Sequence, residues 1–285
     1  MSGMQAGTTA QTEGSAQTSA PTRRRRFTGI FPSWLLHHRP PRLWQEALLI
    51  ALGYFLYGQV RNLVPSHRGL AMQHGRAVQH LQEDLHLNFE LSVNRFVADH
   101  AWLAQLMDYY YATLHFIVTP VCLLWLFLAH SRIYRGARTV LLVTSLLALA
   151  GFWLYPLAPP RLLPQYGYID TVLKFHTWGS LADPKVAQHS NQFAAMPSLH
   201  IGWALWCGAA IFFCARHIWI RLLGVLYPLC TLAVVVGTAN HFFIDAVAGL
   251  AVFAAGIIAQ FLMSGRGAFH EAADPPPEPA TAPGN

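Results

Sequence analysis

Two short polar stretches, each at the start of a long apolar run, hold the residue types best suited to chemistry in this sequence. Residues 196–200 read Met-Pro-Ser-Leu-His and end on His200, while residues 237–245 contain His241 and Asp245. An imidazole or a carboxylate beside an apolar run is costly unless it has a partner or a function. Because His241 and Asp245 are four residues apart, they would share one face of a helix and could hydrogen-bond. We therefore expect His200, His241 and Asp245 to form one site.

The chemistry that suits these three side chains is phosphoryl transfer. A neutral imidazole nitrogen can attack phosphorus and form a phosphohistidine, and we expect His241 to do so. A carboxylate one helical turn away would hold the other ring nitrogen as N–H and stabilise the charge that develops on the ring. The alternative interpretation is a packed His–Asp pair that satisfies only itself.

The residues before His200 predict a helix start that could bind an anion. Pro197 suits the first turn of a helix, because its fixed φ matches and its missing N–H is not needed there. Ser198 and Leu199 would then offer free backbone N–H groups at the positive end of the helix dipole. His200 could protonate a departing oxygen as a general acid. The alternative is an interfacial histidine after an ordinary helix cap.

Three more residues are candidates for contacts with a substrate. Arg161 follows Pro159 and Pro160, and its guanidinium could clamp phosphate oxygens, although it could equally be an anchor at the membrane interface. Lys174 lies in the same loop and could add a point charge, but the interfacial interpretation is favoured for it. His115 lies inside an apolar run, where it either contacts substrate or, as we favour, hydrogen-bonds within a bundle.

Membrane-spanning helices are the elements that must position these residues. Of the 285 residues, 54% are hydrophobic and only 11% are charged, against about 25% charged in soluble domains. Runs of about 20 apolar residues predict an all-α, polytopic membrane protein with six transmembrane helices. The predicted spans are 43–63, 109–129, 140–157, 198–214, 218–237 and 241–263.

The six predicted spans make up one catalytic domain, residues 43–264. It contains an outer insertion, 64–107, which includes a helix near residues 70–87, and an outer active-site loop, 158–197. A tight basic loop, 130–138, is expected between the second and third spans.

The two ends of the chain differ in composition from the domain between them. Residues 1–42 form a basic N-terminal segment whose first part has too few apolar side chains to fold. Residues 265–285 form a tail rich in Pro and Ala that we expect to be disordered.

The distribution of Lys and Arg predicts the orientation in the membrane. Six spans place both termini on one side, and 12 of the 19 Lys and Arg residues fall in segments on that side. The other seven are spread over much longer loops. The positive-inside rule therefore places both termini in the cytoplasm and both histidine stretches at the outer face.

Composition and spacing also exclude several classes of partner. The formal net charge is +6, but the basic residues lie in short loops without a nucleic-acid-binding motif, so we expect no nucleic-acid partner. The remaining histidines lack the spacing of metal ligands, and we expect neither a metal nor another cofactor. The four cysteines lie in apolar runs and are expected to pack as small core residues.

These motifs resemble the type 2 phosphatidic acid phosphatase superfamily over residues 108–262. That superfamily shares a six-helix membrane core with a Pro-Ser-Gly-His-like motif and a later His-x-x-x-Asp. Within it, the closer likeness is to the inositol phosphorylceramide synthase branch, where a Pro-Pro motif follows the third helix, as Pro159 and Pro160 do here. Leu199 replaces the motif's Gly, as is tolerated in that bacterial group.

The resemblance implies a role for each residue of the site and a bacterial plasma membrane as its location. His241 would be the nucleophile, His200 the acid, Asp245 the orienting group and Ser198 a phosphate contact. Two departures matter. The common Lys-x6-Arg-Pro motif is absent, with Arg161 its only stand-in. Valines at 234 and 235 replace the Ser-Arg pair that often precedes the nucleophile.

Fewer positive charges leave room for a phosphodiester substrate and for transfer to an alcohol. The predicted function is therefore a phosphatase or phosphotransferase that acts on a membrane lipid at the outer leaflet. The acceptor is either water or an alcohol, as in inositol-phosphoryl head-group transfer. The alternative from another class is a non-catalytic lipid carrier or scaffold on the same fold.

Overall fold

A computed structural model describes residues 42–63, 68–177 and 192–269 of the chain. Apart from an isolated bridge between Leu157 and Ala194, the regular structure in these residues is helical. The helices, in chain order, are α1 (Leu43–Leu63), α2 (Arg68–Asp84), α3 (Glu90–Asp99), α4 (Ala101–Ala129), α5 (Ser131–Leu154), η2 (Pro160–Leu162), η3 (Pro164–Tyr166), α6 (Thr171–Phe175), α8 (Leu199–Cys214), α9 (Ile218–Gly237) and α10 (Phe243–Ser264).

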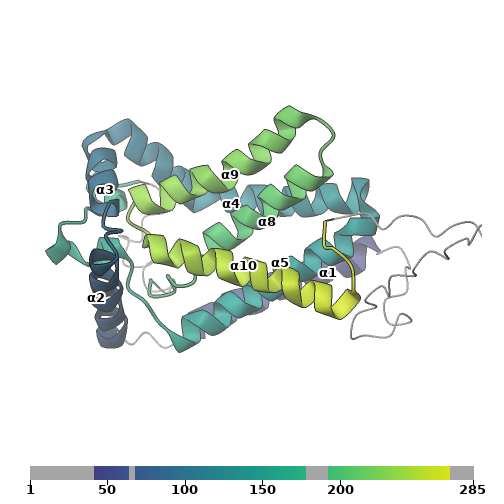
Figure 1. Ribbon diagram of the computed structural model, residues 1–285, viewed down its shortest axis with the longest axis horizontal. Helices are drawn as coiled ribbons and strands as arrows, with labels where there is room; N and C mark the ends of the chain where they lie inside the picture. Colours follow the sequence, from purple (N-terminus) through teal and green to yellow (C-terminus); the bar gives the residue numbers. More distant parts are fainter. Residues whose placement is uncertain (1–41, 64–67, 178–191, 270–285) are drawn as a thin grey trace, which may run out of the picture.

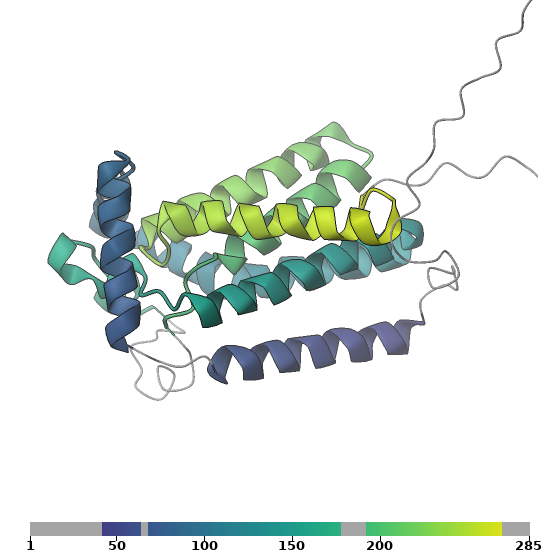
Figure 2. The same cartoon turned by 60° about the horizontal axis from the view of Figure 1, so that its bottom comes forward.

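The long helices run side by side and form a bundle. Helices α4, α5, α8, α9 and α10 make its body, and α1 lies beside them against α5 (Figures 1 and 2). Helix α2 lies across one end of the bundle, next to α3 (Figure 1). We call α2 and α3 together the cap, and this end of the bundle the capped end. The start of α10 and the end of α9 both lie there.

Among the residues that the structure describes, four helices are long and apolar enough to cross a membrane: α4, α5, α9 and α10. The protein is therefore an integral membrane protein. Helix α8 has 16 residues, and in α1, which runs from Leu43 to Leu63, the apolar stretch among the residues whose side chains are described is Leu43–Gly53. Helices α8 and α1 lie where spans were predicted. Four of the six predicted spans are therefore long and apolar enough, among the described residues, to cross a membrane.

The prediction of a basic loop at 130–138 is wrong. Helix α4 ends at Ala129 and α5 begins at Ser131, so only His130 separates them. Charged residues mark where an apolar stretch ends, but Arg is a good helix former and lets the helix continue. Arg138 contacts Glu46 of α1, and this carboxylate also accepts a hydrogen bond from the hydroxyl of Tyr134 at 3.1 Å.

The spans predicted from hydropathy also differ from the helices at two other places, one a helix start and one a helix end. Helix α4 begins at Ala101, eight residues before the predicted span, and takes in the end of the predicted insertion. Helix α5 stops at Leu154 because Tyr155 precedes Pro156, which disfavours helical backbone at the residue before it. The helices at 218–237 and near 70–87 lie where the sequence places them.

The core lies between α4, α5, α8 and α10. Trp206 of α8 is fully buried, and its indole N–H donates to the Ala137 carbonyl of α5 at 2.7 Å. Where α8 passes α9, a Cβ on Gly208 would collide with the Gly224 carbonyl oxygen, so a larger residue would force the helices apart.

Several predicted segments reach beyond the described residues. The N-terminal segment is described only at Arg42, and residues 178–191 of the outer loop lie outside the description. The C-terminal tail is described as far as Phe269, where Ala268 and Phe269 are buried against the core.

Candidate active site

The two polar stretches meet at the capped end of the bundle. The backbone N–H of Ser198 donates to the carbonyl of Asp245 at 2.9 Å. The ring nitrogen Nδ1 of His241 lies 3.0 Å from the carbonyl oxygen of Ala195. A Cβ on Gly249 would lie 2.5 Å from the carbonyl oxygen of Ser198, so glycine is what lets α10 come this close to the start of α8.

His241 does not share a helix with Asp245, contrary to the prediction. It lies in the turn between α9 and α10, and Phe242 is the N-cap of α10. The Asp245 carboxylate reaches back instead, accepting the Phe242 N–H at 2.9 Å and lying 3.5 Å from Nδ1 of His241. The spacing of four therefore brings the pair together through a helix cap, because a third-position carboxylate can bond the cap backbone.

The turn that carries His241 is itself tightly held. The N–H groups of Asn240 and His241 both donate to the Val235 carbonyl, at 3.0 and 3.1 Å. Ala239 has φ of +53°, a left-handed backbone that suits a sharp reversal at the end of a helix. We call residues 238–242 the His241 turn.

The hydrogen bonding of His241 indicates which of its two ring nitrogens carries a proton. A carbonyl oxygen can only accept, so the short contact with Ala195 means that Nδ1 carries the proton. In the neutral ring Nε2 then keeps its lone pair. Nε2 is buried and has no hydrogen-bond partner among the residues that the structure describes. A buried, unprotonated nitrogen without a partner is poised to bind an electrophile.

His200 lies close to His241, in the first turn of α8. The centroids of its ring and of the His241 ring are 5.7 Å apart. His115 of α4 lies edge-on to His200 with centroids 4.4 Å apart, so the structure places this third histidine next to the pair. The distances allow one phosphorus group to contact both His200 and His241.

Tyr111 contacts both histidines and was not singled out from the sequence. Its ring stacks on His200 with centroids 4.2 Å apart and lies 6.2 Å from that of His241. It precedes His115 by four residues, so both lie on one face of α4. That spacing is the signal that could have identified Tyr111.

Ser198 does not offer a free backbone N–H at the start of α8, as was predicted. It is the N-cap of α8, so Pro197 precedes the cap and is not in the first turn. Its N–H is not free, because it donates to Asp245. Its buried Oγ, however, has no hydrogen-bond partner among the described residues. The hydroxyl is thus the group of Ser198 that remains for an anion.

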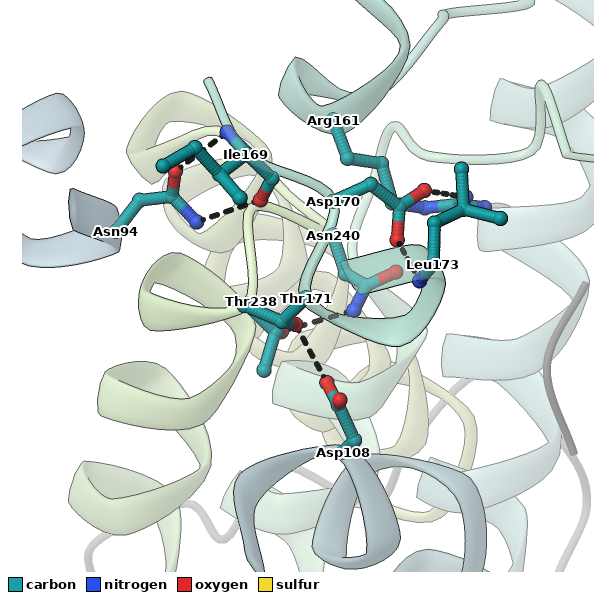
Figure 3. Close-up of polar contacts among 9 residues, drawn as sticks. All are labelled: Asn94, Asp108, Arg161, Ile169, Asp170, Thr171, Leu173, Thr238 and Asn240. Carbon is teal, nitrogen blue, oxygen red and sulfur yellow. Dashed lines mark hydrogen bonds and ion pairs between the residues drawn. The ribbon is translucent and has the colours of Figure 1, made fainter. Parts of the chain in front are cut away.

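Arg161 lies near the His241 turn but is already paired. Its N–H donates to the Ala239 carbonyl at 2.9 Å, and its Nη1 donates to Asp170 at 3.0 Å (Figure 3). Both side chains of this ion pair are buried. Asp170 also caps α6 through the N–H of Leu173. The Nε of Arg161 has no partner in the described part of the chain.

Lys174 lies apart from the histidines. Its ammonium donates to the carbonyl of Ala98, in α3, at 2.7 Å and lies 5.3 Å from the centroid of the Phe175 ring. These contacts tie Lys174 to α3 and to its own helix rather than to His200 or His241. The structure therefore brings together His115, His200, His241, Asp245 and Ser198, places Arg161 beside them and leaves Lys174 on the cap.

A second polar cluster lies beside the His241 turn. Asp108 of α4 accepts hydrogen bonds from the hydroxyls of Thr171 at 2.7 Å and Thr177 at 2.8 Å. Figure 3 shows the bond from Thr171 to Asp108 and, within the turn, the bond from Asn240 to Thr238. These bonds fix α6 and the loop of Arg161 against the bundle, a connection that the sequence does not reveal.

Comparisons with known proteins identify the family. Searches of curated proteins and of solved structures gave no significant match. The model of the PAP2 superfamily matches residues 76–259, which hold the two histidine stretches and most of the described helices. Its members are generally phosphatases or phosphotransferases, and membership implies a membrane enzyme similar to lipid phosphate phosphatases. This chain therefore belongs to the PAP2 superfamily.

Proposed function

We propose that this protein transfers the phosphoryl group of a membrane lipid through a covalent intermediate on His241. The observation that carries the proposal is the buried Nε2 of His241, which has its lone pair and lacks a partner among the described residues, in a ring whose centroid lies 5.7 Å from that of His200. A self-satisfied structural pair would not leave a buried ring nitrogen unbonded, because an unpaired buried polar atom is costly. That cost is repaid when a substrate occupies the site.

The proposed reaction has two steps that share the same groups. First, Nε2 of His241 bonds to phosphorus while the bond from phosphorus to the leaving oxygen breaks and His200 gives that oxygen its proton. Asp245 stabilises the positive ring that results. Second, water or an alcohol gives a proton to His200 and attacks phosphorus, and the bond from phosphorus to His241 breaks.

The charge around the site favours a phosphodiester over a dianionic monoester. The backbone N–H of Arg161 bonds to the His241 turn, and Asp170 already balances the charge of the Arg161 guanidinium. The hydroxyl of Ser198 and Nε of Arg161 remain as donors. A monoanionic diester needs less positive charge than a dianion, so we infer transfer of a phosphorylated head group between alcohols, as in the inositol phosphorylceramide synthase branch. Phosphate release from a monoester is the second candidate.

A groove for a hydrocarbon chain supports a lipid as the substrate. A largely apolar groove of about 470 Å³ runs between α8, α9 and α10. Its lining includes Ile201, next to His200 in the chain, and Phe243 and Ala246, which flank Asp245. An alkyl or polyprenyl chain placed there would have its polar end near the capped end. We propose six spans, with α1 and α8 included, both termini in the cytoplasm and the capped end outside.

Purified protein in lipid nanodiscs with radiolabelled lipids tests the proposal. With a labelled phosphodiester lipid and an alcohol acceptor, we expect a new labelled phospholipid, and with labelled phosphatidic acid we expect slower release of free phosphate. His241→Ala should stop both reactions. A protein that binds these lipids but turns none of them over would support the carrier alternative and overturn the proposal.

A further inference from the structure

The cap contributes three buried polar side chains that the proposed chemistry does not use. Gln82 of α2 and Glu90 and Asn94 of α3 are each at most 1% exposed. A buried polar group on a surface helix is expensive unless its hydrogen bonds are made. All three make them, and several of these bonds go to the backbone on either side of the His241 turn.

On one side of the turn, the cap holds the start of α10. The Phe243 N–H donates to Oε1 of Glu90, and the Ile244 N–H donates to Oε1 of Gln82 at 3.1 Å. Gln82 Nε2 in turn donates to Oε2 of Glu90 at 3.0 Å. The first N–H groups of a helix have no partner within it. Here, two of them are bound by side chains from another part of the chain.

On the other side of the turn, the cap holds the end of α9. Asn94 Nδ2 donates to the carbonyl of Gly237, the last residue of α9, at 3.0 Å. The same amide donates to the Ile169 carbonyl at 3.0 Å and accepts the Ile169 N–H at 2.8 Å (Figure 3). Asn94 therefore fixes the turn relative to the loop that carries Arg161.

We propose that Gln82, Glu90 and Asn94 are positioning residues, which fix His241 for attack by holding both ends of its turn. This rests on the proposed function, in which Nε2 of His241 attacks phosphorus. Only five residues separate Gly237 from Phe243, so a shift at either end would move the imidazole. Displacing a reacting atom by about 1 Å can cost about 100-fold in rate. The insertion that holds the cap is thus part of the active site.

Matched substitutions separate positioning from a general loss of structure. Glu90→Leu and Gln82→Met remove the acceptors for α10, and Asn94→Ala removes the donor for α9. Glu90→Gln keeps an acceptor for Phe243 and serves as the conservative rescue. Glu83→Leu and Asn88→Ala repeat the changes at exposed positions of the same region.

Steady-state kinetics and hydrogen exchange on each variant give the readouts. We expect kcat to fall about tenfold or more in the three cap variants with KM within threefold, because the turn moves but the groove remains. Glu90→Gln keeps the bond from Phe243 but gives Gln82 a donor in place of an acceptor, so it should recover part of kcat. Amide exchange should accelerate in peptides covering 238–245 and stay unchanged in α4 and α5. Both controls should match the wild type.

Two results would overturn the inference. One is unchanged kcat in Gln82→Met and Asn94→Ala; the other is unchanged exchange at 238–245 in all three cap variants. The exchange measurement needs no substrate, so an inactive wild type would defeat the proposed function and still leave this inference open to contradiction. If Glu90→Leu fails to fold, Gln82→Met and Asn94→Ala carry the test.

Discussion

Two polar clusters adjoin the His241 turn, and they differ in how complete their bonding is. In the cluster of Arg161, Asp170 and Asp108, both carboxylates and Nη1 of the guanidinium have partners within the chain, and Nε of Arg161 is the atom left without one among the described residues. In the cluster of His241 and Ser198, a ring nitrogen and a hydroxyl are buried without partners among the described residues. Both clusters are buried, so exposure to solvent does not explain the difference.

The difference separates architecture from chemistry. A buried group whose bonds are complete stabilises the fold, whereas a buried group left incomplete costs free energy that only a bound ligand can return. The first cluster thus holds the loop and α6 in place, whereas the second keeps unbonded groups that a substrate can bind. Substitutions in the second should lower activity far more than stability, and substitutions in the first should do the reverse.

The largest expected effect is at His241. His241→Gln should lower kcat by at least about 10³-fold, because the proposed nucleophile is lost while an amide of similar length remains. The thermal unfolding midpoint should change little. His80→Gln, at an exposed position of α2, is the matched control and should keep full activity. Activity that persists in His241→Gln would mean that the incomplete bonding has another purpose.

Substitution of His200 should cause the next largest loss of activity. His200→Ala should lower turnover of a lipid with an alkyl leaving group by about 10²- to 10⁴-fold, because that alkoxide needs a proton. A substrate with a nitrophenyl leaving group needs no acid, and its first step should be almost normal. An equal loss for both substrates would argue against His200 as the acid.

Substitution of Asp245 should lower kcat less than loss of the carboxylate lowers it in a catalytic triad. The Ala195 carbonyl already fixes the proton on Nδ1, so Asp245 contributes mainly charge from 3.5 Å. Asp245→Asn keeps an oxygen for the Phe242 N–H and should lower kcat about 10- to 100-fold, or about 1.4 to 2.7 kcal/mol. A loss as large as that of His241→Gln would show that Asp245, not Ala195, sets the tautomer.

Substitution of Arg161 should lower stability more than activity, the reverse of the result expected at the histidines. Arg161→Gln leaves the buried Asp170 carboxylate unpaired and should destabilise the fold by about 3 kcal/mol. Asp170→Asn in the same chain should restore most of that loss, as measured by unfolding in detergent. Activity per folded molecule should fall less than in His200→Ala. A larger fall, not recovered in the double variant, would make Arg161 a phosphate clamp first.

Glu90 predicts a pH dependence of stability in the cap. Burial raises its pKa from an ordinary value of 4.5 to about 7, the bonds from Phe243 and Gln82 oppose the rise, and nearby Asp245 adds to it. Because the folded pKa is the higher one, the stabilisation is complete below about pH 4.5 and is lost as pH rises through about 7. It amounts to about 3 kcal/mol.

Unfolding of Glu90→Gln between pH 4.5 and 7 measures this contribution. The variant cannot titrate, so the decline in stability seen in the wild type should be absent from it. Glu83→Gln, at an exposed carboxylate of α2, should keep the wild-type slope. Parallel curves for the wild type and Glu90→Gln would contradict the raised pKa.

The sequence predicts which stretches matter here because each polar residue stands out against an apolar run. His200, His241 and Asp245 were found in this way, and the bounds of α9 follow from hydropathy alone. The position of His241 before α10 was not predictable, because a spacing of four fits both a helix face and a carboxylate that reaches back to a cap. The pairing of Arg161 with Asp170 depends on irregular backbone between them.

The cap illustrates a different limit of sequence reasoning. Gln82, Glu90 and Asn94 look like the solvated face of amphipathic helices, as Glu83 does. Only their tertiary neighbours, the ends of α9 and α10, distinguish buried from exposed polar residues in this stretch. A pattern along one helix carries no information about partners about 150 residues away.

Trapping the covalent intermediate tests the central claim most directly. Wild-type protein mixed briefly with a radiolabelled lipid substrate and quenched in alkali should carry label on one peptide, and mass spectrometry should place it on His241. The bond should be labile to acid, as expected of a phosphohistidine. Two results would contradict the account. One is turnover of the lipid without any labelled protein, in both the wild type and His200→Ala. The other is label on a residue other than His241 while His241→Gln remains active.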